Sequence, residues 1–310
     1  MRLATADLNG TPTCVALLAD DRLLALAAAA RAAGDADAAL GAGSLQALID
    51  GGAATLARAR ALVEKAEAGG LAACITPAGG AAFLAPLPRP EKNVFCVGRN
   101  YIEHIAEGAR AQNTTVAVTD VPVFFTKPRT AVIGASQDVP IFPHVSTQID
   151  YEVELAVIIG TPGRDIAKAD AMAHVFGYTI LNDITARDVQ RRHGGQYFKG
   201  KGLDGSCPMG PWIVTADDLP DPQALKIALR VNDELRQSST TAAMIFDIAT
   251  LIASLSEGLT LEPGDILATG TPSGVGYAMT PPQFLKDGDT VTCEIEGIGR
   301  LGNRVRTVAA

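Results

Sequence analysis

The sequence predicts an α+β protein, mainly β, with a small amino-terminal α/β domain at residues 1–88 and a larger domain at residues 89–310. Apolar residues make up 47% of the 310 positions and charged residues 19%, which supplies a sizeable core and argues against disorder. After residue 93, short β-branched runs do not alternate regularly with long helices, which disfavours a doubly wound parallel sheet or barrel. The stiff, proline-rich segment Ala85–Pro90 marks the expected domain boundary.

Residues 1–88 have an alanine-rich texture in which one strand pair and two helices are expected. The strand pair lies near Val15–Leu26. Ser44 is a typical N-cap for the first helix, and the second helix ends near Gly69–Gly70. The apolar positions recur at helical spacing, at Leu45, Leu48 and Ile49 in the first helix and at Leu56, Ala59, Leu62 and Val63 in the second. Nothing in this region indicates a functional site.

The larger region is predicted to be rich in strands with a few covering helices. Strands are expected at Val94–Val97, Val121–Thr126, Asp150–Gly160, Val175–Leu181, Leu225–Val231, Ile266–Thr269 and Val291–Glu296. Helices are expected at Ala167–His174, Ile184–Arg192 and Ala243–Ser256.

Composition also limits the partners. A formal net charge of −8 leaves no basic surplus for a phosphate backbone, so nucleic acid is not an expected partner. The five cysteines are scattered, without a CxxC pair or zinc spacing, and are expected to be reduced and buried in a cytoplasmic protein. Asp7 interrupts any early apolar region, and the longest apolar stretch, around Leu23–Ala30, is too short to span a membrane.

Two glutamates in the strand Asp150–Gly160 are the first indication of a site. With a side-chain period of two, Glu152 and Glu154 share one face, roughly 7 Å apart at the backbone. A solvated polar face is the simpler interpretation of a bare Glu-x-Glu. However, this face continues into Ala156 and Ile158, and two carboxylates on an apolar surface repel each other unless a cation lies between them.

Asp183 is the candidate third ligand, because it ends an apolar strand where functional groups are often placed. The alternative is an ordinary N-cap of a helix beginning at Ile184. Three carboxylates without clustered histidine or cysteine favour a hard divalent ion, Mg²⁺ first and Mn²⁺ or Ca²⁺ next, and disfavour zinc.

Three further residues are candidates for binding an anionic substrate. Gln190 is placed two turns along the helix expected after Asp183, Lys201 lies in a glycine-rich run, and Thr271 opens a glycine-rich loop whose amides are free to bind carboxylate oxygens. A surface lysine, a capping threonine and ordinary turn glycines are the structural alternatives.

His104 has a carboxylate, Glu107, three positions along. In a helix the two side chains would share a face, and the carboxylate would orient the imidazole and raise its basicity. A surface His–Glu pair is the alternative from spacing alone. The polar segment Gly108–Asp120 is expected to be irregular and to act as a lid over substrate.

Taken together, these motifs closely resemble the fumarylacetoacetate hydrolase superfamily over about residues 90–306. They occur in the family's order, as Gly98-Arg99-Asn100-Tyr101 followed by His104, Phe125-Thr126-Lys127-Pro128, Asp150-Tyr151-Glu152-Val153-Glu154-Leu155, Asn182-Asp183 through Gln190, Lys201 ahead of Cys207-Pro208-Met209-Gly210-Pro211, and Gly264-Asp265-Ile266 leading into Gly270-Thr271-Pro272-Ser273-Gly274-Val275-Gly276. No single motif would carry the resemblance.

The resemblance implies a mixed β-sandwich roll, usually a homodimer, with a small amino-terminal domain. It also assigns roles: Glu152, Glu154 and Asp183 as ligands of Mg²⁺ or Mn²⁺, Tyr101, Lys127, Gln190, Lys201 and Thr271 as substrate contacts, and His104 with Glu107 as the dyad that activates water or moves a proton. The name-giving hydrolases carry a further aspartate near the position of Asn100, so three protein carboxylates are expected for the metal here.

The resemblance implies hydrolysis of a carbon–carbon bond in an acylpyruvate or related β-diketo acid. In that reaction the metal holds the 2-oxo acid, His104 and Glu107 activate water, and Lys201 supplements the charge on a pyruvate enolate. The same site suits decarboxylation of oxaloacetate, hydroxymuconate-type isomerisation or hydrolysis of a diketo-deoxy sugar acid. A protein that binds 2-oxo acids without catalysis is a rival that the dyad disfavours.

Overall fold

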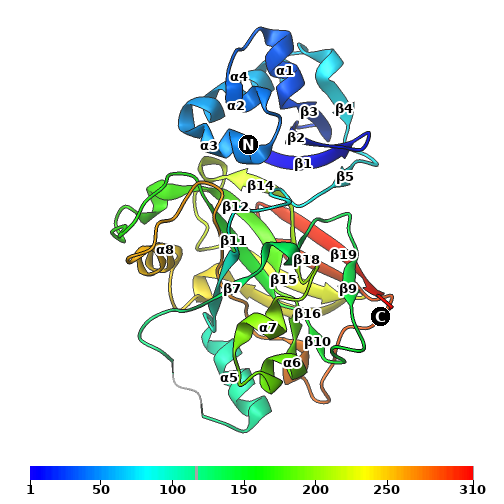
Figure 1. Ribbon diagram of the computed structural model, residues 1–310, viewed down its shortest axis with the longest axis vertical. Coiled ribbons are helices and arrows are strands. Elements are labelled where there is room, and N and C mark those ends of the chain that lie inside the picture. Colours follow the sequence, from blue (N-terminus) through cyan, green and yellow to red (C-terminus); the bar gives the residue numbers. More distant parts are fainter. Residues whose placement is uncertain (116–117, 310) are drawn as a thin grey trace.

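The computed structural model describes residues 1–115 and 118–309, which form three β-sheets covered by helices (Figure 1). The largest sheet has twelve strands. Its main path runs β4 (Ile75–Pro77), β3 (Arg22–Ala25), β2 (Thr11–Leu17), β1 (Arg2–Leu8), β14 (Cys207–Thr215), β12 (Val175–Asn182), β11 (Val153–Ile159), β17 (Ile266–Ala268), β6 (Val94–Gly98) and β7 (Val123–Lys127), while β5 (Ala82–Phe83) pairs with β1 and β8 (Val132–Ile133) with β14.

Two smaller sheets complete the β structure. A five-stranded sheet has the order β16 (Glu234–Thr240), β15 (Lys226–Val231), β18 (Thr290–Ile295), β19 (Gly299–Thr307) and β9 (Val139–Ile141), and β10 (Ile149–Asp150) pairs with β13 (Thr185–Ala186). The sheets mix parallel and antiparallel pairs, since β6 and β17 are parallel whereas β11 and β12 are antiparallel. The predicted mixed, mainly β fold is confirmed.

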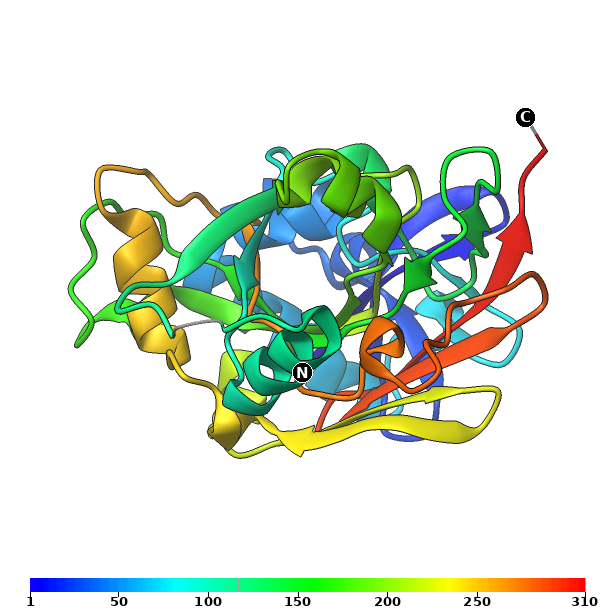
Figure 2. The same ribbon diagram turned by 90° about the horizontal axis from the view of Figure 1, so that it is seen from below.

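The helices lie at the two ends and one side of the molecule. The amino-terminal segment carries α1 (Leu26–Ala33), α2 (Ala38–Gly41), α3 (Leu45–Asp50) and α4 (Gly52–Glu67), whereas α5 (Ile102–Gln112), α6 (Arg187–Arg192) and α7 (Tyr197–Lys201) lie at the opposite end and α8 (Ile248–Ser256) lies to one side (Figure 1). Figure 2 looks at the end that carries α5, α6 and α7. Within residues 1–115 and 118–309, no helix is both long and apolar enough to cross a bilayer.

The strand β11 lies at the centre of the core, and its two faces belong to different hydrophobic clusters. Val153, Leu155, Val157 and Ile159 pack in the cluster that joins this sheet to the five-stranded sheet. Ala156 and Ile158 pack in the second cluster with residues of the amino-terminal segment. The period-two pattern of this strand is confirmed, and the apolar continuation of the glutamate face is core.

The amino-terminal segment joins the rest of the chain through the sheet itself. Arg2 and Leu3 of β1 pair with Val214 and Ile213 of β14, and apolar residues of both segments share one core cluster. The division at residue 88 stays a prediction. The predicted helix cap is observed, because the Ser44 hydroxyl accepts a hydrogen bond from the Ala47 amide at 3.1 Å.

Several local predictions were wrong. The segment Ala167–His174 forms only a 3₁₀ turn at Ala171–His174, and Gly108–Gln112 continues α5 instead of forming an irregular lid; residues 116 and 117 of that lid lie outside the described residues. The strand expected over residues 150–160 is interrupted at Tyr151–Glu152, where the Glu152 amide donates to the Asn182 side chain at 3.0 Å instead of continuing the strand ladder.

Candidate active site

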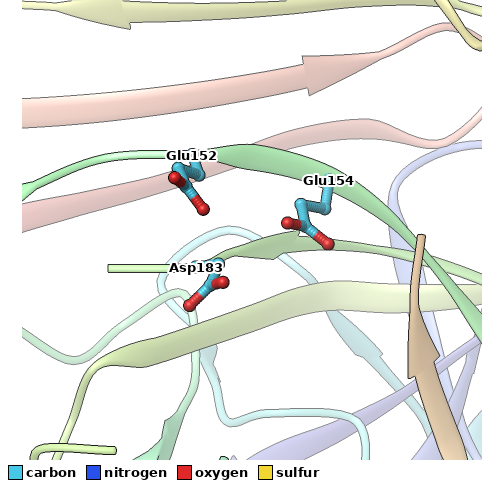
Figure 3. Close-up of side chains that lie close together, drawn as sticks. All are labelled: Glu152, Glu154 and Asp183. Atoms are coloured by element: carbon cyan, nitrogen blue, oxygen red, sulfur yellow. The ribbon is translucent and has the colours of Figure 1, made fainter. Parts of the chain in front are cut away.

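The three predicted metal ligands come together at the paired ends of β11 and β12. Val153 pairs with Asn182 in the antiparallel register, so Asp183 lies opposite Glu152, and the Asp183 amide donates to the Glu152 carbonyl at 2.8 Å. One carboxylate oxygen from each of Glu152, Glu154 and Asp183 lies within 4.8 Å of the others, and all three side chains are buried. Figure 3 shows the carboxylates gathered around a common space, two of them from one ribbon and the third from its neighbour.

Asp183 is not the N-cap of a helix, which was the alternative from the sequence. The helix α6 begins at Arg187, after the short strand β13, and the Asp183 carboxylate instead accepts from Lys127 at 2.7 Å and from Lys201 at 2.6 Å. Gln190 therefore does not share a helix with Asp183, contrary to the prediction. After β12 the chain enters a buried cluster of charged side chains, in which Lys127 and Lys201 hold the Asp183 carboxylate.

Positive side chains surround two of the three carboxylates. Lys201 Nζ lies 2.6 Å from both Glu152 Oε2 and Asp183 Oδ2, and Arg187 Nη2 lies 2.5 Å from Glu152 Oε1. Burial alone raises the pKa of Glu152, but Lys201 and Arg187 outweigh it and bring this pKa below its ordinary range. Burial lowers the pKa of Lys201, whereas Asp183 and Glu152 raise it, with a net increase. Both groups are therefore charged.

Glu154 differs from its neighbours in having no cation beside it. Its Oε2 accepts a hydrogen bond from the Gly270 amide at 2.8 Å, and no lysine or arginine of the described residues lies within ion-pairing distance. Burial raises the pKa of Glu154 well above its ordinary value, and the charges of Asp183 and Glu152 raise it further. A divalent cation would neutralise this charge, so three converging carboxylates with an uncompensated member fit a hard metal ion.

Glu152 and Glu154 line a cavity of about 130 Å³, and Asp183 is fully buried beside them. Buried groups form its floor and exposed groups its rim; the lining residues include Arg99, His104, Gln112, Glu152, Glu154, Arg187, Gln190, Arg191, Lys201, Thr271 and Tyr277. The volume is below the ~300–1,000 Å³ typical of sites for drug-sized ligands, which favours a small substrate.

His104 lines this cavity and forms an oriented pair with Glu107. His104 Nδ1 lies 2.8 Å from Glu107 Oε1, and the Gly274 amide donates to Glu107 Oε2 at 2.8 Å. Both side chains are about nine-tenths buried, so this is not the surface pair that spacing alone allowed. The helix α5 carries the histidine, and the loop after β17 anchors the glutamate, which leaves His104 Nε2 for the cavity.

The predicted substrate contacts fall into two groups. Gln190, Lys201 and Thr271 line the cavity. Tyr101 and Lys127 are buried behind it: Tyr101 is 1% exposed and its hydroxyl has no hydrogen-bond partner among the described residues, and Lys127 is fully buried against Asp183. The geometry gives no support to a direct contact between these two residues and a substrate.

The glycine-rich loop from Thr269 to Gly276 corrects another expectation. Three of its amides are not free for a ligand, because those of Gly270, Gly274 and Gly276 donate to Glu154, Glu107 and Asp150. The loop therefore positions carboxylates of this chain. Thr271 still faces the cavity, and its hydroxyl accepts from Gln237 at 2.8 Å.

Sequence reasoning assigned no role to Arg187, which is central to the site. It lies within the matched motif, and its guanidinium donates to Asp150 at 2.8 Å and to Glu152 and lies over the Tyr277 ring at 4.4 Å from the centroid. The available signal was an arginine shortly after the buried end of β12, where a charged side chain needs a partner. Its partners lie 35 and 37 residues earlier, so the local sequence does not show them.

Comparisons with known proteins agree with this geometry. The family model described as fumarylacetoacetate (FAA) hydrolase C-terminal matches residues 93–306. Oxaloacetate tautomerase YisK of Bacillus subtilis (strain 168) is 51% identical over 222 residues, which are 71% of this chain and 72% of that protein. Human mitochondrial oxaloacetate tautomerase FAHD2A is 47% identical over 232 residues, 74% of this chain and 71% of that one.

Among solved structures, maleylpyruvate hydrolase from Sphingobium sp. SYK-6 in complex with manganese (II) ion and pyruvate is 31% identical, with a TM-score of 0.76 and full coverage of both chains. The manganese in that structure and the acidic triad here support a divalent metal cofactor. The chain is an enzyme of the fumarylacetoacetate hydrolase family.

Proposed function

We propose that this enzyme interconverts the enol and keto forms of oxaloacetate or a closely similar 2-oxo diacid. The observation that carries the proposal is a small cavity lined by Glu152, Glu154 and His104, in which Asp183 completes the carboxylate triad and Glu107 orients the histidine. Two relatives of 51% and 47% identity are oxaloacetate tautomerases, which supports proton transfer rather than the carbon–carbon hydrolysis expected first.

In this proposal Glu152, Glu154 and Asp183 hold a divalent ion, Mg²⁺ or Mn²⁺. When bound, such an ion supplies Lewis-acid stabilisation of negative charge on the substrate oxygens. Lys127 positions Asp183, and Lys201 keeps positive charge between Glu152 and Asp183. Gln190 and Thr271 contact the substrate from the cavity wall.

His104 moves the proton. Its Nδ1–H donates to Glu107, so Nε2 is the free base. Nε2 accepts the proton of the enol hydroxyl at C2, the C2–O bond becomes a carbonyl, and the electron pair of the C2–C3 double bond takes a proton at C3 from the imidazolium. The proton balance is zero and no water is consumed.

The test is the ultraviolet absorbance of enol oxaloacetate, followed after dilution with catalytic amounts of enzyme and either Mg²⁺ or Mn²⁺. We expect a metal-dependent acceleration that a chelator abolishes, and His104→Gln and Glu154→Gln should each reduce kcat/KM by at least ~100-fold. His144→Gln is the matched control, since His144 is exposed and does not line the cavity. An enol decay no faster than the uncatalysed rate, with metal present, would refute the proposal.

Hydrolysis of an acylpyruvate is the second candidate, because the maleylpyruvate hydrolase matches the chain over its full length. In that reaction the same His104 Nε2 would deprotonate water instead of an enol. Pyruvate release from maleylpyruvate and from fumarylpyruvate is measured beside the enol assay. The ratio of kcat/KM for hydrolysis to kcat/KM for tautomerisation then decides between the two functions. The homodimer and the cytoplasmic location remain predictions, which light scattering and cell fractionation can check.

A further inference from the structure

The turn that links β6 to α5 contains an arginine in an unfavourable backbone conformation. Arg99 has φ = +63°, in the left-handed region that a β-carbon disfavours. The residue after it cannot relax, because the Asn100 side chain donates to the carbonyls of Phe246 and Thr269 at 3.0 and 2.9 Å and accepts from the Phe246 amide at 2.8 Å. The turn is therefore held by its surroundings.

The residue before Arg99 is held as well. Gly98 pairs with Val123 in the sheet, and a β-carbon at Gly98 would lie 2.7 Å from the ring of Tyr197. A turn with one left-handed residue is formed with less strain by glycine or asparagine. The turn alone therefore gives no reason for an arginine, and strain of this kind at a cavity indicates that the side chain has a function.

The charge environment of Arg99 differs from that of the other cations in the cavity. Arg187 and Lys201 are buried and paired with carboxylates of the site. Arg99 lines the same cavity but is exposed, and no carboxylate of the described residues lies within ion-pairing distance of it. Arg191, the other exposed arginine of the lining, donates to the neutral side chain of Gln148. The rim therefore has positive charge without a partner.

We propose that Arg99 recognises the second carboxylate of the substrate and thereby selects 2-oxo diacids over 2-oxo acids with an uncharged end. This inference rests on the proposed function, which places the 2-oxo acid end beside Glu152 and Glu154 of the carboxylate triad. The other end then points toward the rim, where a guanidinium can make two parallel hydrogen bonds to a carboxylate. Arg191 adds positive potential at the same opening.

The experiment compares two non-enolisable ligands of equal carbon count, L-malate and L-2-hydroxybutanoate, which differ only in a terminal carboxylate or methyl group. Their dissociation constants are measured by calorimetry on the full chain with Mg²⁺. Arg99→Gln should weaken malate binding roughly 10- to 100-fold and hydroxybutanoate binding less than about threefold, as expected for one charge-assisted contact. Arg192→Gln, on the exposed surface of α6 and outside the cavity lining, should change neither.

A second variant separates recognition from structure. Arg99→Gly relieves the left-handed strain, so its Tm should equal or exceed that of the wild type while its malate affinity falls as in Arg99→Gln. Equal losses for both ligands, or an unchanged malate affinity, would overturn the inference. If the preference for malate over hydroxybutanoate depends on Arg99 but the wild type does not accelerate enol decay, the proposed function fails and the inference about recognition stands.

Discussion

The buried pair of Lys127 and Asp183 offers the sharpest test of how this site is held together. Lys127 is fully buried, and its ammonium lies 2.7 Å from Asp183 Oδ1 and 3.1 Å from the Ile184 carbonyl, with a further bond to the Lys201 carbonyl. Lys127→Met removes the charge and leaves two buried carbonyls without this donor. Breaking a buried ion pair from one side costs about 3–5 kcal/mol, and we expect that loss in the free energy of unfolding.

A double variant tests whether the charges of Lys127 and Asp183 stabilise the protein as one pair. Asp183→Asn leaves the Lys127 ammonium buried without its carboxylate and should cost a similar amount. In Lys127→Met/Asp183→Asn neither charge of the pair remains, so the combined loss should fall short of the sum by ~1–3 kcal/mol. Asp183→Asn also removes the ion pair of Asp183 with Lys201, but this loss occurs both in the single Asp183→Asn variant and in the double variant and therefore cancels in the cycle. Lys201 still faces Glu152 in every variant.

The assay is urea unfolding of the metal-free protein in a chelator, followed by the fluorescence of Trp212, the single tryptophan of the chain, in β14. Circular dichroism must give the same midpoint for the energies to be comparable. Lys168→Met is the control, because the ion pair of Lys168 with Asp247 is solvent-exposed and should contribute at most about 1 kcal/mol. Strictly additive losses, or a Lys127→Met variant within ~1 kcal/mol of the wild type, would refute this reasoning.

Three further predictions concern single residues. Burial, Asp183 and Glu152 raise the pKa of Glu154 in the metal-free folded protein. The folded protein therefore keeps a proton on Glu154 that the unfolded chain loses above the ordinary pKa of 4.5. The free energy of unfolding should consequently fall as the pH rises from 4.5 toward the raised pKa. Glu154→Gln should flatten that slope in a pH series of urea titrations; an unchanged slope would assign it to other groups. Asp247→Ala removes the cap of α8, in which the carboxylate accepts from the Thr250 amide at 2.7 Å, and should cost ~1 kcal/mol of unfolding free energy in the same titration. Gly274→Ala places a β-carbon 2.0 Å from the Arg236 carbonyl oxygen, at a φ of +106°, and displaces the amide that anchors Glu107. Both Tm and the activity that depends on His104 should therefore fall. Full activity would show that this loop is not needed to orient the His104–Glu107 pair.

Local patterns were sufficient for much of the fold. Runs such as Val175–Leu181 and Val291–Glu296 became β12 and β18 within a residue or so, because alternating β-branched residues favour a pleated surface wherever they pack. The Ser44 cap formed because its hydroxyl needs only an amide three residues along. In contrast, β1 was missed, since its seven residues include no valine, isoleucine or aromatic side chain and the strand is held by pairing with β2 and β14.

The sequence by itself determined which carboxylates could bind a metal, because a period of two places Glu152 and Glu154 on one face whatever surrounds them. Only the tertiary structure decided that Asp183 lies opposite Glu152, since the register of β11 on β12 joins residues about thirty positions apart. It also decided that Arg187 pairs with Asp150 and Glu152, and that the amides of Gly270, Gly274 and Gly276 bind carboxylates of this chain. These contacts depend on long-range strand pairing and on the burial of charge, which no local window of sequence contains.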